Sequence, residues 1–503
     1  MSAREAILIG VDIGTTNLKA VAIDAARNLL SLCRRPMVIA TPAPGAAEFD
    51  LTALDRALHD VLAETAATLA AKGRDLARVA AISVDSIGES FVGLDADDRP
   101  VLPVPTWYDR RTGRLRTTVG IGAKEWYDTT GMVDDDIYTI WRLLWWRRAC
   151  PDEMRRITRL FSVADYALFL LGKAHVANPS LSARSGLADR NTLAWSQEHL
   201  AAAGIDEGLM PRLLPQGRVA AGLTAQAARR TGLVQGTPLV HAGHDHACAG
   251  FGCGVVTPGT FVDSAGTAES LTTVVSAPIT WEGVNRGEYD CYPHAVPGRY
   301  LLSGHIPSSG GAIDWMTARL IGPAPAPSAR EVLWEAAAKA PPGSGGVRVA
   351  PYLQGTGSPW NRRDERLRID GIDAQTSAGD MLRAVHEGLA AWLGINVERF
   401  EAISGVTAGK LLLTGGGSRN RSYSEIKAAM LRRPLLASDV PEAAGIGAAL
   451  MGGIAVGLFA DAQAALAGPA PDLQQIAPDP ELATACDAIR ASLVAHLTPQ
   501  SAP

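Results

Sequence analysis

The chain has 503 residues, which is too long for one ordinary hydrophobic core and predicts two or three domains. Hydrophobic residues make up 47% and charged residues 20%, a balance typical of a folded globular protein rather than a disordered one. The net charge of −5, with no long run of Lys or Arg, argues against binding to nucleic acid or to an anionic membrane surface.

The cysteines are irregularly spaced and form no CxxC pair, which predicts free thiols in a reducing compartment rather than a disulfide framework or a zinc site. The N-terminal segment reaches Asp12 too soon to be a secretory signal. We therefore expect a cytoplasmic protein. The cysteines are Cys33, Cys150, Cys248, Cys253, Cys291 and Cys486.

The first strong pattern is AILIGVDIGTTNLKAVAID at residues 6–24, which predicts two strands joined by a tight turn. The turn contains Gly14, Thr15 and Thr16. Glycine permits a close backbone approach there, and two hydroxyls beside free N–H groups suit a phosphate. Asp12 ends the first strand, where a carboxylate can hold a Mg2+ ion that bridges phosphates. A plain hairpin turn without a ligand is the alternative.

The segment HAGHDHACAGFG, residues 241–252, places Asp245 between His244 and His246 ahead of a predicted helix. Asp245 can be a helix cap, a ligand in a transition-metal site with its histidine neighbours and His241, or a base aimed at a substrate. Imidazole and carboxylate suit such a metal, but the HExxH pattern is absent. If the segment is a strand end, the two flanking histidines point one way and Asp245 the other.

The hairpin pattern returns in GTFVDSAGTAESLTTVV at residues 259–275, where Asp263, Gly266 and Thr267 repeat the order of Asp, Gly and Thr in the first hairpin. A repeat separated by some 250 residues indicates two related domains, each with a Gly-Thr turn. Two such turns that face each other would hold a polyphosphate from both sides.

The third pattern is LLLTGGGSRNRSYSEIKAAML at residues 411–431, a predicted strand that runs into Gly415–Gly417. A helix is expected to start near Asn420 or Ser422, with Glu425 completing a capping box with Ser422. A Gly-rich turn from strand to helix is a common nucleotide-binding device, although neither GxGxxG nor a Walker A loop occurs here.

Residues 443–460, AAGIGAALMGGIAVGLFA, are uncharged and lie at the edge of membrane-spanning length. They have no aromatic belt and no flanking basic cluster. A buried helix packed through its small residues is therefore the favoured interpretation.

Together these motifs resemble the FGGY family of carbohydrate kinases, over residues from about 6 to about 460. The resemblance implies an α/β fold in which two actin-like, RNase H-like (ASKHA) domains flank a catalytic cleft. We assign the domain with the sugar pocket and the first phosphate loop to residues 1–240, and the nucleotide-binding domain to residues 241–503. The motifs are DIGTT (12–16), PTWYDRRT (105–112), FSVADYALFLLGKAHVANPSLSARSGLADRNTLAW (161–195), SAGTAES (264–270), TGGGSRN (414–420) and PEAAGIGAAL (441–450).

By this resemblance the chain transfers the γ-phosphoryl group of ATP to a hydroxyl of a small sugar, with Asp245 as catalytic base. The helix that follows Asp245 is expected to hold its carboxylate ionised. Asp12 and Asp245 are expected to hold Mg2+. The expected ATP contacts are Gly14, Thr15, Thr16, Asn17, Lys19, Gly266, Thr267, Gly310, Gly415, Gly416 and Asn420.

Residues 84–95 match the family's sugar-pocket segment, and Glu89 falls where glycerol kinase-like members carry Glu and xylulokinase-like members carry His. The alternatives are a solvated loop charge for Glu89, a structural ion pair for Asp109 and Arg110, core packing for Trp107, and polar lining for His246. The expected sugar contacts are Glu89, Trp107, Asp109, Arg110 and His246.

Three departures from the family pattern leave the fold expectation intact but put the substrate in question. Arg142 stands where a family signature has Lys, and His386 occupies a usually apolar position. His246 follows the catalytic Asp, where Asn or Gln is commonest.

The leading substrate hypothesis is a ketopentose such as xylulose, phosphorylated at its terminal hydroxyl. A polyol kinase of glycerol or erythritol type is the alternative, because of Glu89. An actin-like ATPase, or a sugar-binding regulator without kinase activity, would belong to another class, and neither needs the sugar-pocket segment together with Asp245. The expected partners are the sugar and ATP, with no nucleic acid and no membrane, and a homodimer is left open.

Overall fold

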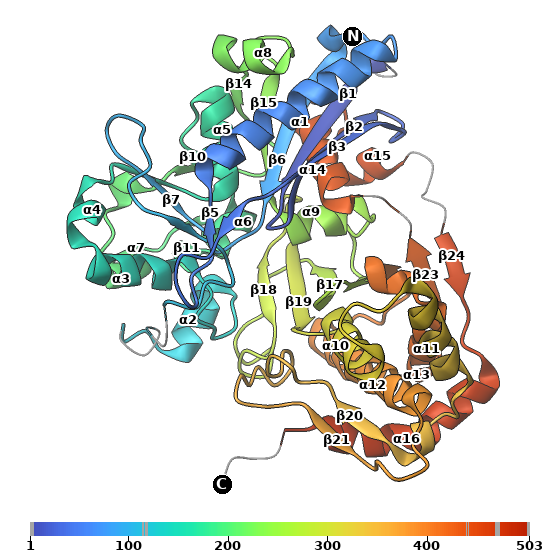
Figure 1. Ribbon diagram of the computed structural model, residues 1–503. Coiled ribbons are helices and arrows are strands. Elements are labelled where there is room, and N and C mark those ends of the chain that lie inside the picture. Colours follow the sequence, from blue (N-terminus) through green and yellow to red (C-terminus); the bar gives the residue numbers. More distant parts are fainter. Residues whose placement is uncertain are drawn as a thin grey trace.

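The computed structural model describes residues 5–112, 115, 119–438, 440, 442–467 and 473–499, which form a mixed α/β chain built on two main sheets (Figure 1). Within the described residues the first sheet has, in spatial order, the strands β14 (Val219–Gly222), β15 (Pro238–His244), β6 (Val79–Ser86), β1 (Ile7–Ile13), β2 (Asn17–Asp24) and β3 (Leu29–Pro36). The second has β18 (Asp290–Pro293), β19 (Tyr300–Ile306), β17 (Glu269–Val275), β16 (Thr260–Ala265), β22 (Lys410–Thr414), β23 (Leu435–Ser438) and β24 (Leu473–Ile476).

The two sheets repeat one topology. In the first, β1, β2 and β3 form an antiparallel meander, and β6 and β15 extend it in parallel from β1. In the second, β16, β17 and β19 form the meander, and β22 and β23 extend it in parallel from β16. The predicted repeat and the two-domain actin-like fold class are therefore confirmed.

Both predicted hairpins are present. In the first, Asp12 lies opposite Lys19, and the Gly14 N–H donates to the Asn17 carbonyl (3.1 Å). In the second, the Gly266 N–H donates to the Ala268 carbonyl (2.8 Å). The backbone thus closes each turn and leaves its Gly-Thr residues at the edge of a sheet.

The helices start and stop at local signals. Asp50 caps the first helix, where its carboxylate accepts from two backbone N–H groups, and Ser377 and Asp380 form a capping box at the longest one. The helices are α1 (Leu51–Ala71), α2 (Ala123–Thr130), α3 (Thr139–Ala149), α4 (Pro151–Arg156), α5 (Val163–Gly172), α6 (Pro179–Ala183), α7 (Gln197–Ala203), α8 (Ala225–Thr231), α9 (Asp245–Gly252), α10 (Gly310–Ile321), α11 (Pro327–Lys339), α12 (Ala378–Ser404), α13 (Arg421–Leu431), α14 (Ala443–Ala455), α15 (Ala462–Leu466) and α16 (Pro480–Leu497).

Short elements complete the fold around the sheets. The short strands are β4 (Ile39–Ala40), β5 (Glu48–Phe49), β7 (Val92–Leu94), β8 (Val104–Pro105), β9 (Arg159–Phe161), β10 (Val176–Ala177), β11 (Ala188–Asp189), β12 (Ala194–Trp195), β13 (Arg212–Leu213), β20 (Arg348–Ala350) and β21 (Arg368–Asp370). The 3-10 helices are η2 (Leu76–Arg78), η4 (Glu207–Leu209), η5 (Ser344–Gly346) and η6 (Gly416–Arg419).

The late helix α14 packs on the first sheet, where Figure 1 shows it in red against the blue strands. A methyl group on Gly10 of β1 would lie 1.8 Å from the Gly445 carbonyl oxygen, and one on Gly447 would lie 1.9 Å from the Cys248 carbonyl oxygen. The small residues of 443–460 thus allow backbone-to-backbone contact, as predicted, although the helix ends earlier, at Ala455. Among the described residues, no helix is long and apolar enough to cross a membrane.

Gly447→Ala is expected to destabilise the fold by about 1–3 kcal/mol or more, because its new methyl group meets a backbone carbonyl that cannot turn away. Gly394→Ala is the matched control: it also lies inside a helix, but its methyl group would meet nothing closer than 3.7 Å. That control should raise the free energy of unfolding by up to about 1 kcal/mol. Urea unfolding of both variants checks this, and equal effects would contradict the close packing of α14.

The boundary between residues 240 and 241, which stays a prediction, lies inside β15, and the first sheet continues to His244. One local expectation is corrected. The predicted capping box of Ser422 and Glu425 is wrong: Asn420 caps α13 by accepting from the Tyr423 N–H, and Glu425 pairs with Arg421. An asparagine caps a helix as well as a serine does, so the earlier residue starts the helix.

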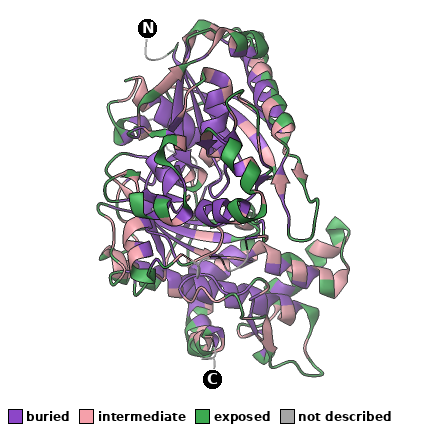
Figure 2. Cartoon of the chain, turned by 90° about the vertical axis from the view of Figure 1, so that its left-hand side faces the viewer, coloured by how far each residue is buried: buried purple, intermediate pink, exposed green. Residues whose placement is uncertain are grey.

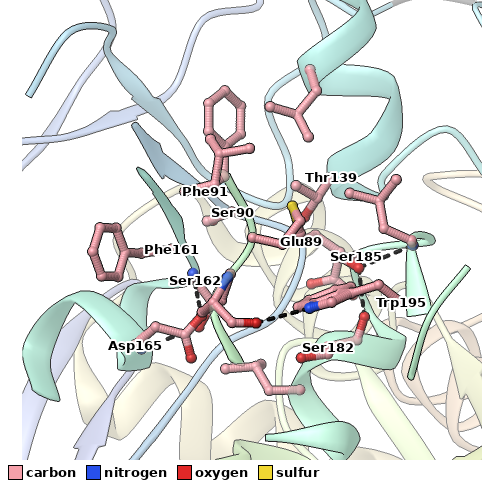
Figure 3. Close-up of a pocket in the computed structure, with 16 residues that line it drawn as sticks. Glu89, Ser90, Phe91, Thr139, Phe161, Ser162, Asp165, Ser182, Ser185 and Trp195 are labelled. Carbon is pink, nitrogen blue, oxygen red and sulfur yellow. Dashed lines mark hydrogen bonds between the residues drawn. The ribbon is translucent and has the colours of Figure 1, made fainter. Parts of the chain in front are cut away.

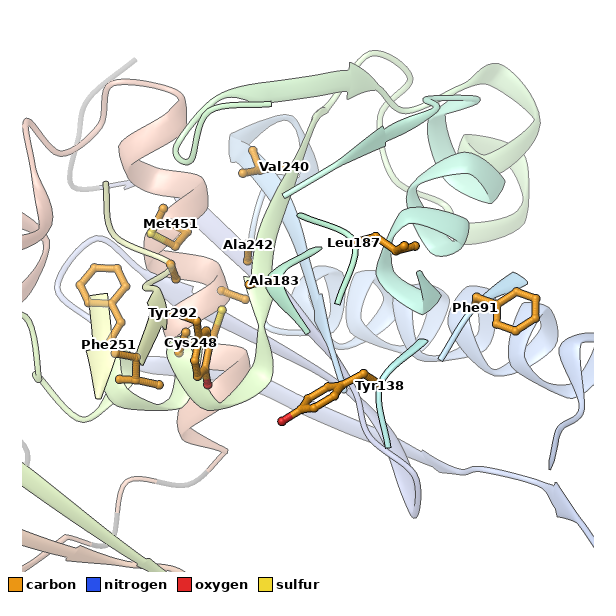
Figure 4. Packing of buried hydrophobic residues seen from close by; sticks show 14 of the residues in the cluster. Phe91, Tyr138, Ala183, Leu187, Val240, Ala242, Cys248, Phe251, Tyr292 and Met451 are labelled. Carbon is orange, nitrogen blue, oxygen red and sulfur yellow. The ribbon is translucent and has the colours of Figure 1, made fainter. Parts of the chain in front are cut away.

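The core is continuous across the two halves of the chain. Figure 2 shows buried residues along the central strands of both halves, and exposed residues mainly on the outer helices and loops. Figure 4 shows one cluster in which Val240 of β15, Phe251 of α9, Met451 of α14 and Tyr292 of β18 belong to the same core. This shared core fixes the end of β15 and the start of α9 between the sheets.

Candidate active site

Asp245 is the first residue of α9, directly after β15 ends, and 18% of its side chain is exposed. His244 occupies the cap position, so the helix-cap hypothesis for Asp245 is wrong. The His246 N–H donates to the Asp245 carboxylate (2.7 Å). The carboxylate is therefore held in place, yet remains accessible to a ligand.

The start of α9 is not the only influence on the pKa of Asp245. Burial raises the pKa of Asp245 well above its usual range, and the negative charge of Asp12 raises it further. The His246 N–H opposes this shift, but it is outweighed. A carboxyl group with a raised pKa accepts a proton readily, which suits a general base.

The three histidines near Asp245 have different surroundings. His241 is buried, with Nε2 2.6 Å from an Asp165 oxygen. His244 is buried as well, with Nδ1 3.0 Å from the Tyr292 hydroxyl, and burial lowers its pKa well below the usual value. His246 is exposed. In the described part of the chain, no three His, Cys, Asp or Glu side chains are placed to hold a metal ion together, so the transition-metal hypothesis is not supported.

Two carboxylates lie side by side at the ends of neighbouring parallel strands. Asp12 of β1 is in register with Asp85 of β6, and both are buried. Neither oxygen of Asp85 has a hydrogen-bond partner among the described residues. Burial raises the pKa of Asp12, which Lys19 at 3.6 Å partly offsets, and it raises that of Asp85 well above its usual range.

Asp85 was missed in the sequence, although its signal is present. Asp85 lies one residue before the end of a buried strand, as Asp12 does, and the carboxyl ends of parallel strands meet at one edge of a sheet. The charges of Asp12 and Asp245 both raise the pKa of Asp85, and we call these three carboxylates the acidic group. Unpaired buried carboxylate oxygens fit Mg2+, which takes oxygen ligands from one or two carboxylates together with substrate phosphates.

Glu89 is 7% exposed, so the hypothesis of a solvated loop charge is wrong. The Arg184 Nε donates to its carboxylate (2.6 Å), and the same guanidinium donates through Nη1 to Asp290 (2.9 Å). Asp290 also accepts from the Val133 N–H (2.7 Å). Arg184 and Asp290, which the sequence did not indicate, thus link the sugar-pocket segment to the second sheet.

Residues 105–112 are held in place by an ion pair and by hydrogen bonds to buried side chains. Asp109 is buried and forms an ion pair with Arg111 (2.7 Å) rather than with Arg110, which is exposed. Trp107 is 41% exposed, so it is not a core residue and stays a candidate for sugar contact. The buried guanidinium of Arg142 donates to the Trp107 carbonyl (2.7 Å), which gives this departure from the family pattern a structural role.

A small cavity lies beside Glu89 in the first domain (Figure 3). Its walls include Phe91, Phe161 and Trp195. Its volume of about 40 Å³ holds a few water molecules and not a five-carbon sugar.

The structure brings the nucleotide candidates of the second domain together. The Gly310 N–H donates to the Gly266 carbonyl (3.0 Å), which joins the start of α10 to the second Gly-Thr turn. A methyl group on Gly415 would lie 2.5 Å from the Ala265 carbonyl oxygen, so the Gly-rich turn lies against the same hairpin. The exposed members of this group are Gly266, Thr267, Gly415 and Gly416.

The predicted ATP contacts on the first hairpin lie in its turn, except for Asn17 and Lys19, which lie on β2. Thr16 at its tip is exposed, and Gly14, Thr15 and Asn17 are partly exposed. Lys19 lies 3.6 Å from Asp12 and 2.6 Å from Glu442 just before α14. The Lys19 ammonium is therefore held beside the acidic group. A phosphate bound at this hairpin would add further negative charge near the ammonium.

Both halves of the chain match models of the FGGY family of carbohydrate kinases, the N-terminal domain over residues 7–252 and the C-terminal domain over residues 263–456. A xylulose kinase of Lactococcus lactis subsp. lactis (strain IL1403) is 26% identical over 455 residues, which cover 90% of this chain and 88% of that protein. A glycerol kinase of Geobacter sp. (strain M21) is 29% identical over 465 residues and 90% of each chain.

The crystal structure of a xyloylose kinase from Brucella ovis is 26% identical to this chain and superposes with a TM-score of 0.88. The match covers 97% of this chain and 98% of that one.

Proposed function

Because the chain belongs to the FGGY family of carbohydrate kinases and is an ATP-dependent sugar phosphotransferase, we propose that it phosphorylates the terminal hydroxyl of a ketopentose such as xylulose. The observation that carries this proposal is the partly exposed Asp245 carboxylate, which the His246 N–H holds at the start of α9. The named relatives include kinases of xylulose, which supports a five-carbon sugar.

Phosphoryl transfer needs alignment, charge stabilisation and a proton acceptor more than covalent help. In our proposal Asp245 takes the proton of the acceptor hydroxyl as that oxygen bonds to the γ-phosphorus, while the bond from the γ-phosphorus to the bridging oxygen breaks and ADP leaves. The Gly-Thr turns supply backbone N–H groups to the phosphates, and Lys19 adds a positive charge. Asp12 and Asp245 would hold Mg2+, which supplies neutralisation of the phosphate charge when it is bound.

The charges around Glu89 favour a neutral, hydroxyl-rich substrate. The guanidinium of Arg184 is already shared by Glu89 and Asp290, so it has little capacity left for a carboxylate on the substrate. A sugar acid would add a negative charge beside the carboxylates of Glu89 and Asp290 and near the acidic group at Asp12. Hydroxyl groups can instead donate to the carboxylate oxygens.

A polyol kinase of glycerol or erythritol type is the second candidate. Glu89 is the observation that favours it, because a buried carboxylate accepts hydrogen bonds from two neighbouring hydroxyls and needs no carbonyl group on the substrate. The named glycerol kinase is similar to this chain over nearly the same length.

Release of ADP in the presence of Mg2+ tests the proposal with a panel of pentuloses, hexuloses, glycerol and erythritol. We expect the highest kcat/KM with a pentulose, and product analysis should place the phosphate on the terminal carbon. Preference for glycerol or erythritol would establish the second candidate instead. ADP release that no sugar or polyol stimulates would contradict both.

A further inference from the structure

A buried ionic cluster lies in the second domain. The side chain of Lys427 on α13 is fully buried, with Nζ 2.6 Å from an Asp263 oxygen and 3.0 Å from a Glu269 oxygen. Asp263 lies on β16 and Glu269 begins β17, so the two carboxylates stand on either side of the second Gly-Thr turn. The proposed phosphoryl transfer uses none of these side chains directly.

Such a cluster is a poor device for stability alone. Taking ions out of water costs several kcal/mol each, and a well-packed apolar replacement is often as stable. Here two carboxylates share one ammonium. Burial, followed by the charge of Glu269, raises the pKa of Asp263 to about 7. Burial works against the charge on Lys427, yet the two carboxylates outweigh it and raise its pKa.

Glu269 is the hub of the cluster. One of its oxygens accepts from the Ser309 hydroxyl (2.6 Å) and from the Tyr423 hydroxyl (3.1 Å), while Lys427 holds the other. Ser309 immediately precedes α10, and its N–H donates to the Thr267 carbonyl (3.0 Å). The carboxylate therefore bonds directly to the segment that carries Gly310.

Through Tyr423, Glu269 is also connected to the Gly-rich segment. Tyr423 lies in the first turn of α13, and its N–H donates to the side chain of Asn420, which caps that helix (3.1 Å). His386 of α12 stacks on the Tyr423 ring, with ring centroids 5.1 Å apart. Burial, together with Arg383 and Lys427, lowers the pKa of His386 to about 3, so the ring packs as a neutral group and adds no second cation.

We propose that Glu269, held by Lys427, is a positioning residue for the nucleotide: it fixes the second Gly-Thr turn, the start of α10 and the start of α13 at one spacing. The three segments carry the nucleotide candidates Gly266, Thr267, Gly310 and Asn420. The proposal rests on the ATP site described above and not on the identity of the sugar. Loss of the hub would let the segments move apart and would weaken nucleotide binding before it affected sugar binding.

The test is titration of the full chain with Mg2+ and ADP by calorimetry, without any sugar. Glu269→Ala leaves Lys427 paired with Asp263, so the remaining charges balance, but it removes the acceptor for both hydroxyls. We expect the Kd for ADP to rise by about 10-fold, a loss of about 1.4 kcal/mol. Glu269→Gln keeps an acceptor oxygen and should restore most of the affinity. In assays at saturating ATP, the KM for the sugar should stay within about 2-fold.

Tyr423→Phe provides a second test that removes one hydroxyl and no charge, should Glu269→Ala fail to fold. We expect it to raise the Kd for ADP about 3-fold, with the thermal transition retained. Wild-type affinity for ADP in the folded variants would overturn the proposal, and so would an equal loss of sugar and nucleotide affinity. Failure of the wild-type chain to bind ADP would instead count against the nucleotide site itself.

Discussion

Asp245→Asn is expected to lower kcat by at least about 10²-fold while the Kd for ADP stays within about 2-fold of the wild-type value. The amide has nearly the size of the carboxylate and its oxygen can still accept from the His246 N–H, so the local structure should persist. It cannot take the proton of the acceptor hydroxyl. Steady-state kinetics with the best sugar, together with an ADP titration, checks both parts of this result.

The pH profile gives this prediction a second readout. The pKa of Asp245 is raised by burial and by Asp12, so wild-type kcat/KM should fall as the pH drops through that raised value and the base becomes protonated. The variant should lack this acid limb. Asp152→Asn is the matched control, because Asp152 also lies in the first turn of a helix but is solvent-exposed. Near-wild-type turnover of Asp245→Asn would rule out its role as the base.

Glu89→Ala is expected to lower kcat/KM for the preferred sugar by more than about 10²-fold. Two hydrogen bonds from substrate hydroxyls to a charged acceptor contribute about 1.5–3 kcal/mol each, and both are lost. The buried guanidinium of Arg184 also loses one of its two carboxylate partners, which lets it move into the site. Slow hydrolysis of ATP without sugar depends on the phosphate turns and should change little.

Two variants sharpen the test of Glu89. Glu89→His introduces the residue that the family resemblance implies for xylulokinase-like members, and it should shift preference toward xylulose if this position selects the substrate. Glu401→Ala breaks a carboxylate–arginine pair with Arg433 in the second domain and should leave kcat/KM unchanged. If Glu89→Ala and Glu89→His both keep the wild-type substrate profile, the polyol candidate loses its support.

Local patterns predicted the parts of the fold that local physics determines. The two hairpins follow from short apolar runs around Gly-Thr turns, and the helix at 443–455 follows from small residues that permit backbone contact. The resemblance to a family assigned Asp245 the role of catalytic base, which stays a prediction. These predictions needed no knowledge of which distant segments meet.

The site residues that the sequence did not reveal come together only in the folded chain. Asp85 joins Asp12 only because β6 lies parallel to β1 in a register that the sequence does not reveal. Arg184 and Asp290 are separated by 106 positions and meet across the two domains. The pKa of Asp245 depends on its burial and on the charge of Asp12, and a rule about helix termini contains neither of these influences.

A crystal structure of the chain with its preferred sugar, Mg2+ and a non-hydrolysable ATP analogue would test the role of Asp245 directly. We expect the acceptor hydroxyl to lie within about 2.6–3.2 Å of the Asp245 carboxylate. We also expect sugar hydroxyls to donate to Glu89, and the phosphates to lie between the turns that contain Thr15 and Thr267. A sugar whose terminal hydroxyl contacts another side chain, with Asp245 turned away from it, would rule out Asp245 as the base.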